Sequence, residues 1–166
     1  MRLSELFREV EFDGSIKNDA DINLVTDDSR LVRPGSLFVC IRHRSFDGHT
    51  AALDALASGA AAVVTQDRLG LENELHVADS RSTYARLCAA LCNHPERKLR
   101  MIGVTGTNGK TTVTTLIRNI LSDSGTKTLL TGTVCNRLGD ENLPSGLTTP
   151  KPPELYSPVS YTHLTL

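Results

Sequence analysis

The residues best suited to chemistry lie in one glycine-rich segment, residues 103–112, which reads GVTGTNGKTT. Glycines allow successive backbone N–H groups to turn toward one anion, and a following helix adds the partial positive charge of its N-terminus. Lys110 could then reach the outer phosphates of a nucleotide, and the Thr111 hydroxyl could coordinate a bridging Mg²⁺. The strict pattern G-x-x-x-x-G-K-[ST] has glycine where this chain has Val104, so the match is to a variant. The predicted nucleotide contacts are Gly106, Thr107, Asn108, Gly109, Lys110, Thr111 and Thr112.

A glycine-rich turn with a solvent-facing lysine is the alternative interpretation of this segment. It leaves the position of Lys110 unexplained. The lysine stands at the first turn of the expected helix, where the helix dipole disfavours a cation unless an anion binds nearby. A preceding strand, a following helix and three glycines are separate requirements of a phosphate site, and together they favour nucleotide binding.

Short β-rich segments alternate with helical ones along the chain, which predicts an α/β fold with a parallel or mostly parallel sheet. Strands are expected at residues 22–26, 36–41, 61–65, 75–78, 101–105 and 128–133, and helices at 49–58, 81–93 and 110–122. Asp79 or Ser80 is the expected cap of the helix at 81–93. Its buried stripe is expected to comprise Tyr84, Leu87, Cys88 and Leu91.

The polar segment 93–100, NHPERKLR, separates two apolar patterns and predicts a domain boundary. The expected organisation is a domain at 1–97, the start of a second domain at 98–155, and a discordant tail at 156–166. The helix at 110–122 should bury one apolar face, formed by Val113, Leu116, Ile117, Ile120 and Leu121. Residues 98–166 are expected to fold poorly alone, because much of their apolar surface lacks a partner.

Composition excludes several classes of function. The 18 basic and 19 acidic residues give a net charge of −1, so the chain has no general attraction for nucleic acid or an anionic membrane. Aromatic residues make up 4%, which argues against base-stacking platforms. No apolar run is long enough to span a bilayer and the N-terminus lacks a signal-peptide pattern, so a cytoplasmic location is expected. The four cysteines read as reduced apolar residues, with a metal cluster at Cys88, Cys92 and His94 as the weaker alternative.

A second group of polar residues follows the expected strands of the first domain. Residues 28–30 read Asp-Ser-Arg, and residues 42–44 read Arg-His-Arg. Basic side chains at the carboxyl end of a strand are suitable neighbours for a diphosphate, with a solvated basic loop as the alternative. Asp28 and Arg30 are compatible with a local turn and a surface ion pair. His49 is expected in the first turn of a helix rather than as a catalyst.

Together these segments resemble the Mur ligases, which add amino acids to the peptidoglycan precursor in the cytoplasm. The motifs are DSR at 28–30, PGSLFV at 34–39, DGH at 47–49, GA at 59–60 and the loop GTNGKTT, in the family's order. GTNGKTT and the LTTP at 147–150 are similar to the type that adds the third peptide residue. The type that adds the terminal dipeptide usually carries a loop resembling GSSGKT. The resemblance covers about residues 20–155.

The resemblance implies an enzyme that uses ATP and Mg²⁺ to join a diamino acid, diaminopimelate or lysine, to UDP-N-acetylmuramoyl-L-alanyl-D-glutamate through an acyl phosphate. Lys110 would be catalytic, and Thr111 would hold the metal. The UDP substrate would contact Ser29, Arg44, Ser45, Phe46, Thr148 and Thr149. The protein is expected to be a cytoplasmic monomer with no nucleic-acid partner and no membrane insertion.

In this family the central domain continues with further Mg²⁺ ligands and a modified lysine, and a third domain binds the incoming amino acid. Because the 166 residues hold no counterpart of these parts, they are expected to be inactive alone, as a truncated reading frame with an unrelated tail. Two alternatives stay open: a ligase of the type that adds the terminal dipeptide, and a non-catalytic nucleotide-binding module.

Overall fold

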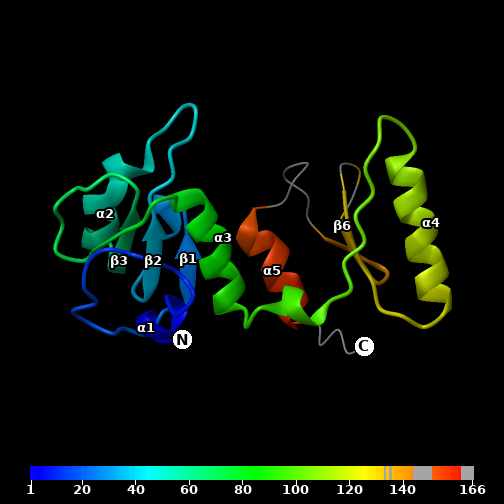
Figure 1. Ribbon diagram of the computed structural model, residues 1–166, viewed down its shortest axis with the longest axis horizontal. Helices are drawn as coiled ribbons and strands as arrows, with labels where there is room; N and C mark the ends of the chain where they lie inside the picture. Colours follow the sequence, from blue (N-terminus) through cyan, green and yellow to red (C-terminus); the bar gives the residue numbers. More distant parts are fainter. Residues whose placement is uncertain (133, 135, 144–150, 162–166) are drawn as a thin grey trace. The chain divides into compact units, whose positions relative to one another are not determined.

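The computed structural model describes residues 1–132, 134, 136–143 and 151–161 (Figure 1). The chain divides into two compact units, Met1–Asn93, called unit 1, and His94–Leu166, called unit 2. Each unit has its own sheet, and they are described separately. Among the described residues, no helix is long and apolar enough to cross a membrane.

Unit 1 is built on a four-stranded parallel sheet in the order β1-β2-β3-β4. The strands are β1 (Leu24–Thr26), β2 (Ser36–Val39), β3 (Ala60–Thr65) and β4 (Glu74–His76). Every residue of β2 is buried, so both faces of the sheet are covered. The predicted parallel α/β architecture is confirmed here. Strand β4 starts and ends earlier than the predicted strand at 75–78.

Helices and short 3-10 turns connect and cover these strands. They are α1 (Leu3–Leu6), η1 (Ser29–Leu31), η2 (Gly48–Ala51), α2 (Ala52–Ala57) and α3 (Ser80–Leu91). One core cluster joins Phe38 and Val63 of the sheet to Ala52 and Ala55 of α2.

Helix α3 begins where the sequence indicates. The Asp79 carboxylate accepts hydrogen bonds from the backbone N–H groups of Arg81 (2.9 Å) and Ser82 (3.1 Å) and thereby caps the helix. Of the predicted stripe, Tyr84, Leu87 and Cys88 are buried, whereas Leu91 is half-buried. The predicted apolar face therefore packs within unit 1.

Unit 2 contains a three-stranded antiparallel sheet in the order β5-β6-β7. Its elements are η3 (Pro95–Lys98), α4 (Lys110–Asp123), β5 (Leu129–Thr131), β6 (Asn136–Leu138), β7 (Glu141–Leu143) and α5 (Pro152–Tyr161). The predicted strand at 101–105 is wrong, because these residues have no regular secondary structure. Met101 is 74% exposed, and no described strand pairs with this segment. An isolated extended segment gains no ladder hydrogen bonds.

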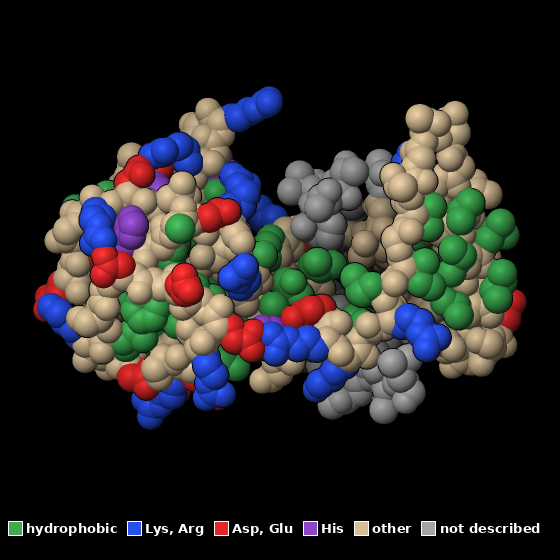
Figure 2. Space-filling model, viewed as in Figure 1, with side chains coloured by type: hydrophobic (Ala, Val, Ile, Leu, Met, Phe, Trp, Pro, Cys, Tyr) green, Lys and Arg blue, Asp and Glu red, His purple; other side chains and the backbone are tan. Residues whose placement is uncertain are grey.

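The apolar face of α4 is a second correction. The sequence predicts a buried face, yet Val113, Leu116 and Ile120 are exposed, and Leu116 retains 56% of its accessible surface. The other two residues of that face, Ile117 and Leu121, are half-buried. Figure 2 shows hydrophobic side chains gathered over α4. The one buried residue of this helix is Arg118, whose guanidinium donates to the Gly139 carbonyl (2.5 Å) and the Asp140 carboxylate (3.0 Å).

Candidate functional site

The glycine-rich segment lies directly before α4 in unit 2, as the sequence predicts. Gly109 precedes the first residue of the helix and has a φ of +77°, a left-handed conformation that favours glycine. Gly106 also has a positive φ of +149°. The chain therefore turns at two glycines and enters the helix at Lys110, with the helix N-terminus at the end of the loop.

The side chain of Lys110 folds back over this loop. Its Nζ donates to the carbonyl oxygens of Gly106 (2.5 Å) and Thr107 (3.3 Å). These bonds hold the ammonium beside the loop rather than extended into solvent. Asn108, Gly109, Thr111 and Thr112 are exposed, so an anion can reach the loop without displacing buried groups.

The Thr111 hydroxyl is a suitable oxygen ligand for a divalent cation. It stands in the first turn of α4, is exposed, and makes no hydrogen bond to any described residue. Thr114, one turn further on, instead donates to the carbonyls of Lys110 (3.0 Å) and Thr111 (3.1 Å). Of these two threonines, only Thr111 is therefore available to a ligand at the helix start.

A second candidate site lies at the carboxyl edge of the unit 1 sheet. The segments that follow β1, β2 and β3 meet there because the strands are parallel. In open α/β sheets, ligands bind at this edge. Ser29 lies in η1, directly after β1, and is half-buried. The neighbouring Asp28 accepts from the backbone N–H of Arg30 (3.0 Å) and pairs with its guanidinium (2.6 Å), which confirms the predicted turn and ion pair.

Residues 42–47, called the substrate hairpin because three of the predicted substrate residues lie in it, follow β2. Arg42 and Asp47 pair as an isolated antiparallel bridge, and the His43 N–H donates to the Phe46 carbonyl (2.8 Å). Arg44 and Ser45 therefore form the tip of a tight turn. Arg44, Ser45 and Phe46 are all exposed. The structure thus groups these three predicted substrate residues on one small projection.

The basic residues of this hairpin are not equivalent. The Arg42 guanidinium bonds the carboxylates of Asp47 (3.0 Å) and Asp67. His43 Nε2 lies 3.4 Å from the nearly buried carboxylate of Asp27. Among the described residues, Arg44 has no hydrogen bond or ion pair. Acidic neighbours therefore engage Arg42 and His43, and the contact of this loop with a diphosphate stays a prediction.

Asp47 organises the start of the following helical segment. Its carboxylate accepts from His49 Nδ1 (2.6 Å) and from the His49 backbone N–H (3.0 Å), and it also pairs with Arg42. These bonds, first of all the one from the His49 side chain, hold the pKa of Asp47 well below its usual range. His49 lies in the first turn of η2, as the sequence predicts.

Sequence reasoning missed the acidic partners at this edge. Asp27 follows β1 and Asp67 follows β3, so their positions after strands were an available signal. Helix α3 also contributes to this edge, since the Tyr84 hydroxyl donates to the Asp27 carboxylate (3.3 Å). Thr148 and Thr149 lie outside the described residues.

The alternative of a metal cluster at Cys88, Cys92 and His94 gains no support from the described residues. Cys40 and Cys88 are buried, and burial raises the pKa of the Cys40 thiol to about 12. Within the part of the chain that the structure describes, the one group with metal-ligand spacing is Asp47, His49 and Asp67.

Comparisons with known proteins match both units. The Mur ligase family catalytic domain matches residues 21–94, and the Mur ligase middle domain matches residues 104–161. Two similar relatives are UDP-N-acetylmuramoyl-L-alanyl-D-glutamate–2,6-diaminopimelate ligases. That of Geobacillus kaustophilus is 45% identical over 79% of this chain and 27% of its own length. That of Listeria monocytogenes EGD-e is 36% identical over 90% of this chain and 31% of its own length.

A solved structure of a ligase of the same name is similar with a TM-score of 0.75 and 28% identity, over 96% of this chain and 33% of that one. The chain belongs to the Mur ligase family. It spans about a third of the length of the curated relatives it matches.

Proposed function

We propose that this chain is the N-terminal part of an ATP-dependent ligase that joins 2,6-diaminopimelate to UDP-N-acetylmuramoyl-L-alanyl-D-glutamate. The names and identities of the relatives over both units support this assignment. The observation that carries it is the presence of two candidate sites in one chain. One is the exposed Arg44 beside Ser45 at the sheet's carboxyl edge, which has no partner among the described residues, and the other is a glycine-rich loop at a helix start. A nucleotide-binding module alone would need only the second.

The proposed domains follow from this assignment. Residues 1–97 would bind the UDP substrate, and residues 98–155 would begin the ATP-binding domain. The exposed Arg44 guanidinium is suited to the diphosphate, because it can donate two parallel hydrogen bonds to phosphate oxygens. Ser29 supplies a hydroxyl at the neighbouring strand end.

The proposed reaction is amide-bond formation in two steps. The substrate carboxylate attacks the γ-phosphoryl group of ATP, releasing ADP and forming an acyl phosphate. The amine of the diamino acid then attacks the acyl carbon, loses a proton and releases inorganic phosphate. A carboxylate is a poor electrophile because of its negative charge, and phosphorylation removes that charge and provides a leaving group.

In this scheme the chain's own residues position and neutralise phosphate groups. The loop N–H groups and the Lys110 ammonium would bind the outer phosphates of ATP. The exposed Thr111 hydroxyl would hold Mg²⁺, which supplies further charge neutralisation when bound. Lys110 would exchange its bonds to the carbonyls of Gly106 and Thr107 for bonds to phosphate.

The proposal is tested by calorimetric titration of the full 166-residue chain with each ligand separately. The wild type should bind UDP-N-acetylmuramoyl-L-alanyl-D-glutamate and, independently, ADP with Mg²⁺. Arg44→Ala should lower the affinity for the UDP substrate by about 10- to 100-fold, and Ser29→Ala should lower it by up to about tenfold. Neither substitution should change the affinity for ADP, whereas Lys110→Ala should lower the affinity for ADP and leave that for the UDP substrate unchanged.

A matched control is Arg33→Ala, because Arg33 is an exposed arginine at the opposite, amino-terminal end of β2. It should leave the affinity for the UDP substrate unchanged. ADP binding without any binding of the UDP substrate would contradict the ligase assignment and favour the nucleotide-binding module. Equal losses from Arg44→Ala and Arg33→Ala would show that the contact depends on net charge rather than on the hairpin tip.

A further inference from the structure

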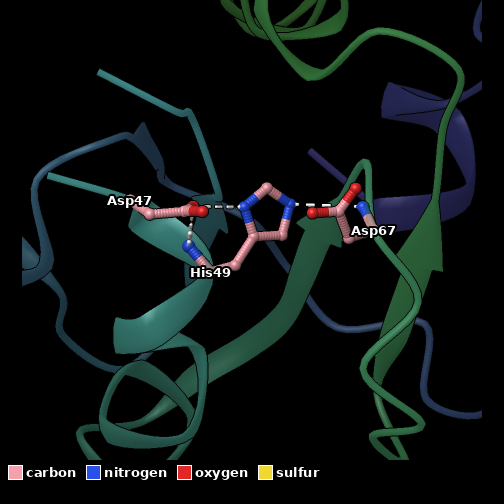
Figure 3. A group of neighbouring side chains, drawn as sticks. All are labelled: Asp47, His49 and Asp67. Atoms are coloured by element: carbon pink, nitrogen blue, oxygen red, sulfur yellow. Dashed lines mark hydrogen bonds and ion pairs between the residues drawn. The ribbon is translucent and has the colours of Figure 1, made fainter. Parts of the chain in front are cut away.

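Asp47, His49 and Asp67 form a compact group at the carboxyl edge of the unit 1 sheet (Figure 3). Their residue types and spacing suit a divalent metal, but each of the three side chains already bonds a partner within the protein. His49 Nδ1 bonds Asp47 (2.6 Å), while His49 Nε2 accepts from the backbone N–H groups of Gln66 (3.1 Å) and Asp67 (3.3 Å). Arg42 bonds both carboxylates. The group is therefore a closed hydrogen-bond network.

The partners of His49 determine its tautomer. Two backbone N–H donors point at Nε2, so this nitrogen must present a lone pair. A carboxylate faces Nδ1, so this nitrogen carries the proton. The side chain is only 7% exposed, which keeps water from replacing these partners. The neutral imidazole thus joins Asp47, at the end of the substrate hairpin, to the segment that follows β3.

Arg42 closes the same network from the other arm of the substrate hairpin. Its guanidinium reaches Asp47 within the hairpin and Asp67 after β3. Its carbonyl oxygen accepts a hydrogen bond from the Arg81 guanidinium at the start of α3 (3.0 Å). Both arms of the hairpin are therefore tied to other elements of unit 1, while Arg44, Ser45 and Phe46 at its tip remain exposed.

The backbone beside the network leaves no room for adjustment. A Cβ added at Gly48 would lie 2.8 Å from the backbone nitrogen of Ile41 and 3.0 Å from its carbonyl oxygen. The chain returning from the hairpin thus packs directly against the chain entering it. The Gly48 N–H donates to the same Ile41 carbonyl (3.0 Å).

We propose that His49 is a positioning residue whose neutral Nδ1–H imidazole, together with Arg42, Asp47 and Asp67, clamps the base of the substrate hairpin. The clamp fixes the direction in which Arg44 is presented, so a diphosphate meets a guanidinium whose backbone is already ordered. Ordering before binding reduces the entropy lost on binding and raises affinity. This inference rests on the proposed function for its ligand, whereas the clamp itself rests on the geometry of unit 1.

The first test is the tautomer of His49 in the ¹⁵N-labelled full chain. Long-range ¹H–¹⁵N correlation spectra should show a protonated Nδ1 and a bare Nε2. This signature is specific, because an imidazole that only fills space has no reason to keep this form. A protonated Nε2, or exchange between tautomers, would overturn the proposal. So would stoichiometric binding of Zn²⁺ at His49, since a metal would have to displace the two backbone donors.

The second test compares hairpin order and affinity in His49→Ala and His76→Ala. His76 Nε2 bonds the carbonyl of Gln66 (3.0 Å), so its loss removes a bond to the same segment without touching the hairpin. His49→Ala should lower the amide order parameters of residues 43–46 to below about 0.6, and His76→Ala should not. His49→Ala should also lower the affinity for the UDP substrate about tenfold and leave ADP binding unchanged.

A third variant covers the case in which His49→Ala does not fold. Asp67→Ala removes an exposed carboxylate and one partner of Arg42, so unit 1 should stay folded while the hairpin loosens and affinity falls about threefold. A wild type that keeps the ordered hairpin and the Nδ1–H tautomer but binds no UDP substrate would contradict the proposed function. Undiminished affinity and order in both Asp67→Ala and His49→Ala would contradict the clamp.

Discussion

The two units differ in where their apolar side chains go. In unit 1 every residue of β2 is buried, Phe38 of this strand packs with α2, and α3 buries an apolar stripe of its own. Among the described residues of unit 2, the buried apolar ones are Leu138 and Pro95, and α4 exposes Val113, Leu116 and Ile120. Apolar residues recur at helical spacing in both units. Such spacing predicts which face of a helix is apolar, but that face is buried only where another element packs against it.

A matched pair of leucine truncations tests whether apolar side chains are buried in unit 1 and exposed in unit 2. Leu37→Ala in β2 should destabilise unit 1 by about 2–5 kcal/mol, because Leu37 is fully buried and its loss leaves a cavity. Leu116→Ala in α4 should change the stability of unit 2 by less than about 0.5 kcal/mol, because the side chain is largely exposed and alanine favours helix. Urea titrations followed through resolved amide signals report each unit separately.

The result for Leu116 also tests the exposed face directly. If Leu116→Ala cost as much as Leu37→Ala, the α4 face would be covered in solution. Sedimentation of the wild type would then show association of chains, which the truncation should abolish. Equal and small losses at both positions would instead contradict the packed core of unit 1.

Two glycines provide a smaller, complementary contrast. Gly48→Ala in unit 1 should cost about 1–3 kcal/mol, because the added Cβ would press against the backbone of Ile41 at 2.8 Å. Gly109→Ala in unit 2 should cost about 1 kcal/mol, because only its φ of +77° opposes a side chain and no atom lies within 4 Å. The same amide-resolved urea titration measures both. A larger loss of stability in Gly109→Ala would mean that the glycine-rich segment packs more tightly than its exposure indicates.

Local patterns predicted the elements of unit 1 well because near neighbours set an apolar run, a helical spacing and a helix cap, even where the paired strands lie far apart in the sequence. Strands β2 and β3 and helix α3 occur close to where β-rich segments, helical spacing and the Asp79 cap place them. The expected strand at 101–105 failed because a short apolar run becomes a strand only beside another strand. Strands β6 and β7 are largely polar, although the intervening Gly139-Asp140 was a usable hairpin signal.

The candidate sites also divide into features that near neighbours in the sequence determine and contacts between distant residues. The glycine-rich segment and the start of α4 at Lys110 follow from local sequence, because turn chemistry and helix capping involve near neighbours. The partners of Arg42 do not follow from local sequence. Asp67 lies 25 residues away and reaches Arg42 only because parallel strands bring their carboxyl ends to one edge. The sequence therefore indicated a basic loop, whereas the structure shows that Arg44 is the arginine of this loop with no partner among the described residues.

The smallest expected effect concerns acid stability and is specific to the hairpin base. Hydrogen bonds from His49 and Arg42 lower the pKa of Asp47 in the folded chain, so the folded state binds fewer protons than the unfolded state. The stabilisation is therefore complete above the ordinary carboxyl pKa of about 4 and declines as the pH falls below it. Asp47→Asn cannot bind that proton, so its unit 1 stability should fall less steeply with acid. Between pH 7 and pH 2, the urea midpoint of the wild type should be higher than that of Asp47→Asn at neutral pH. The two midpoints should converge as the pH falls. A constant difference at every pH would mean that Asp47 contributes through its shape rather than its charge, and would separate the clamp from the electrostatic network around it.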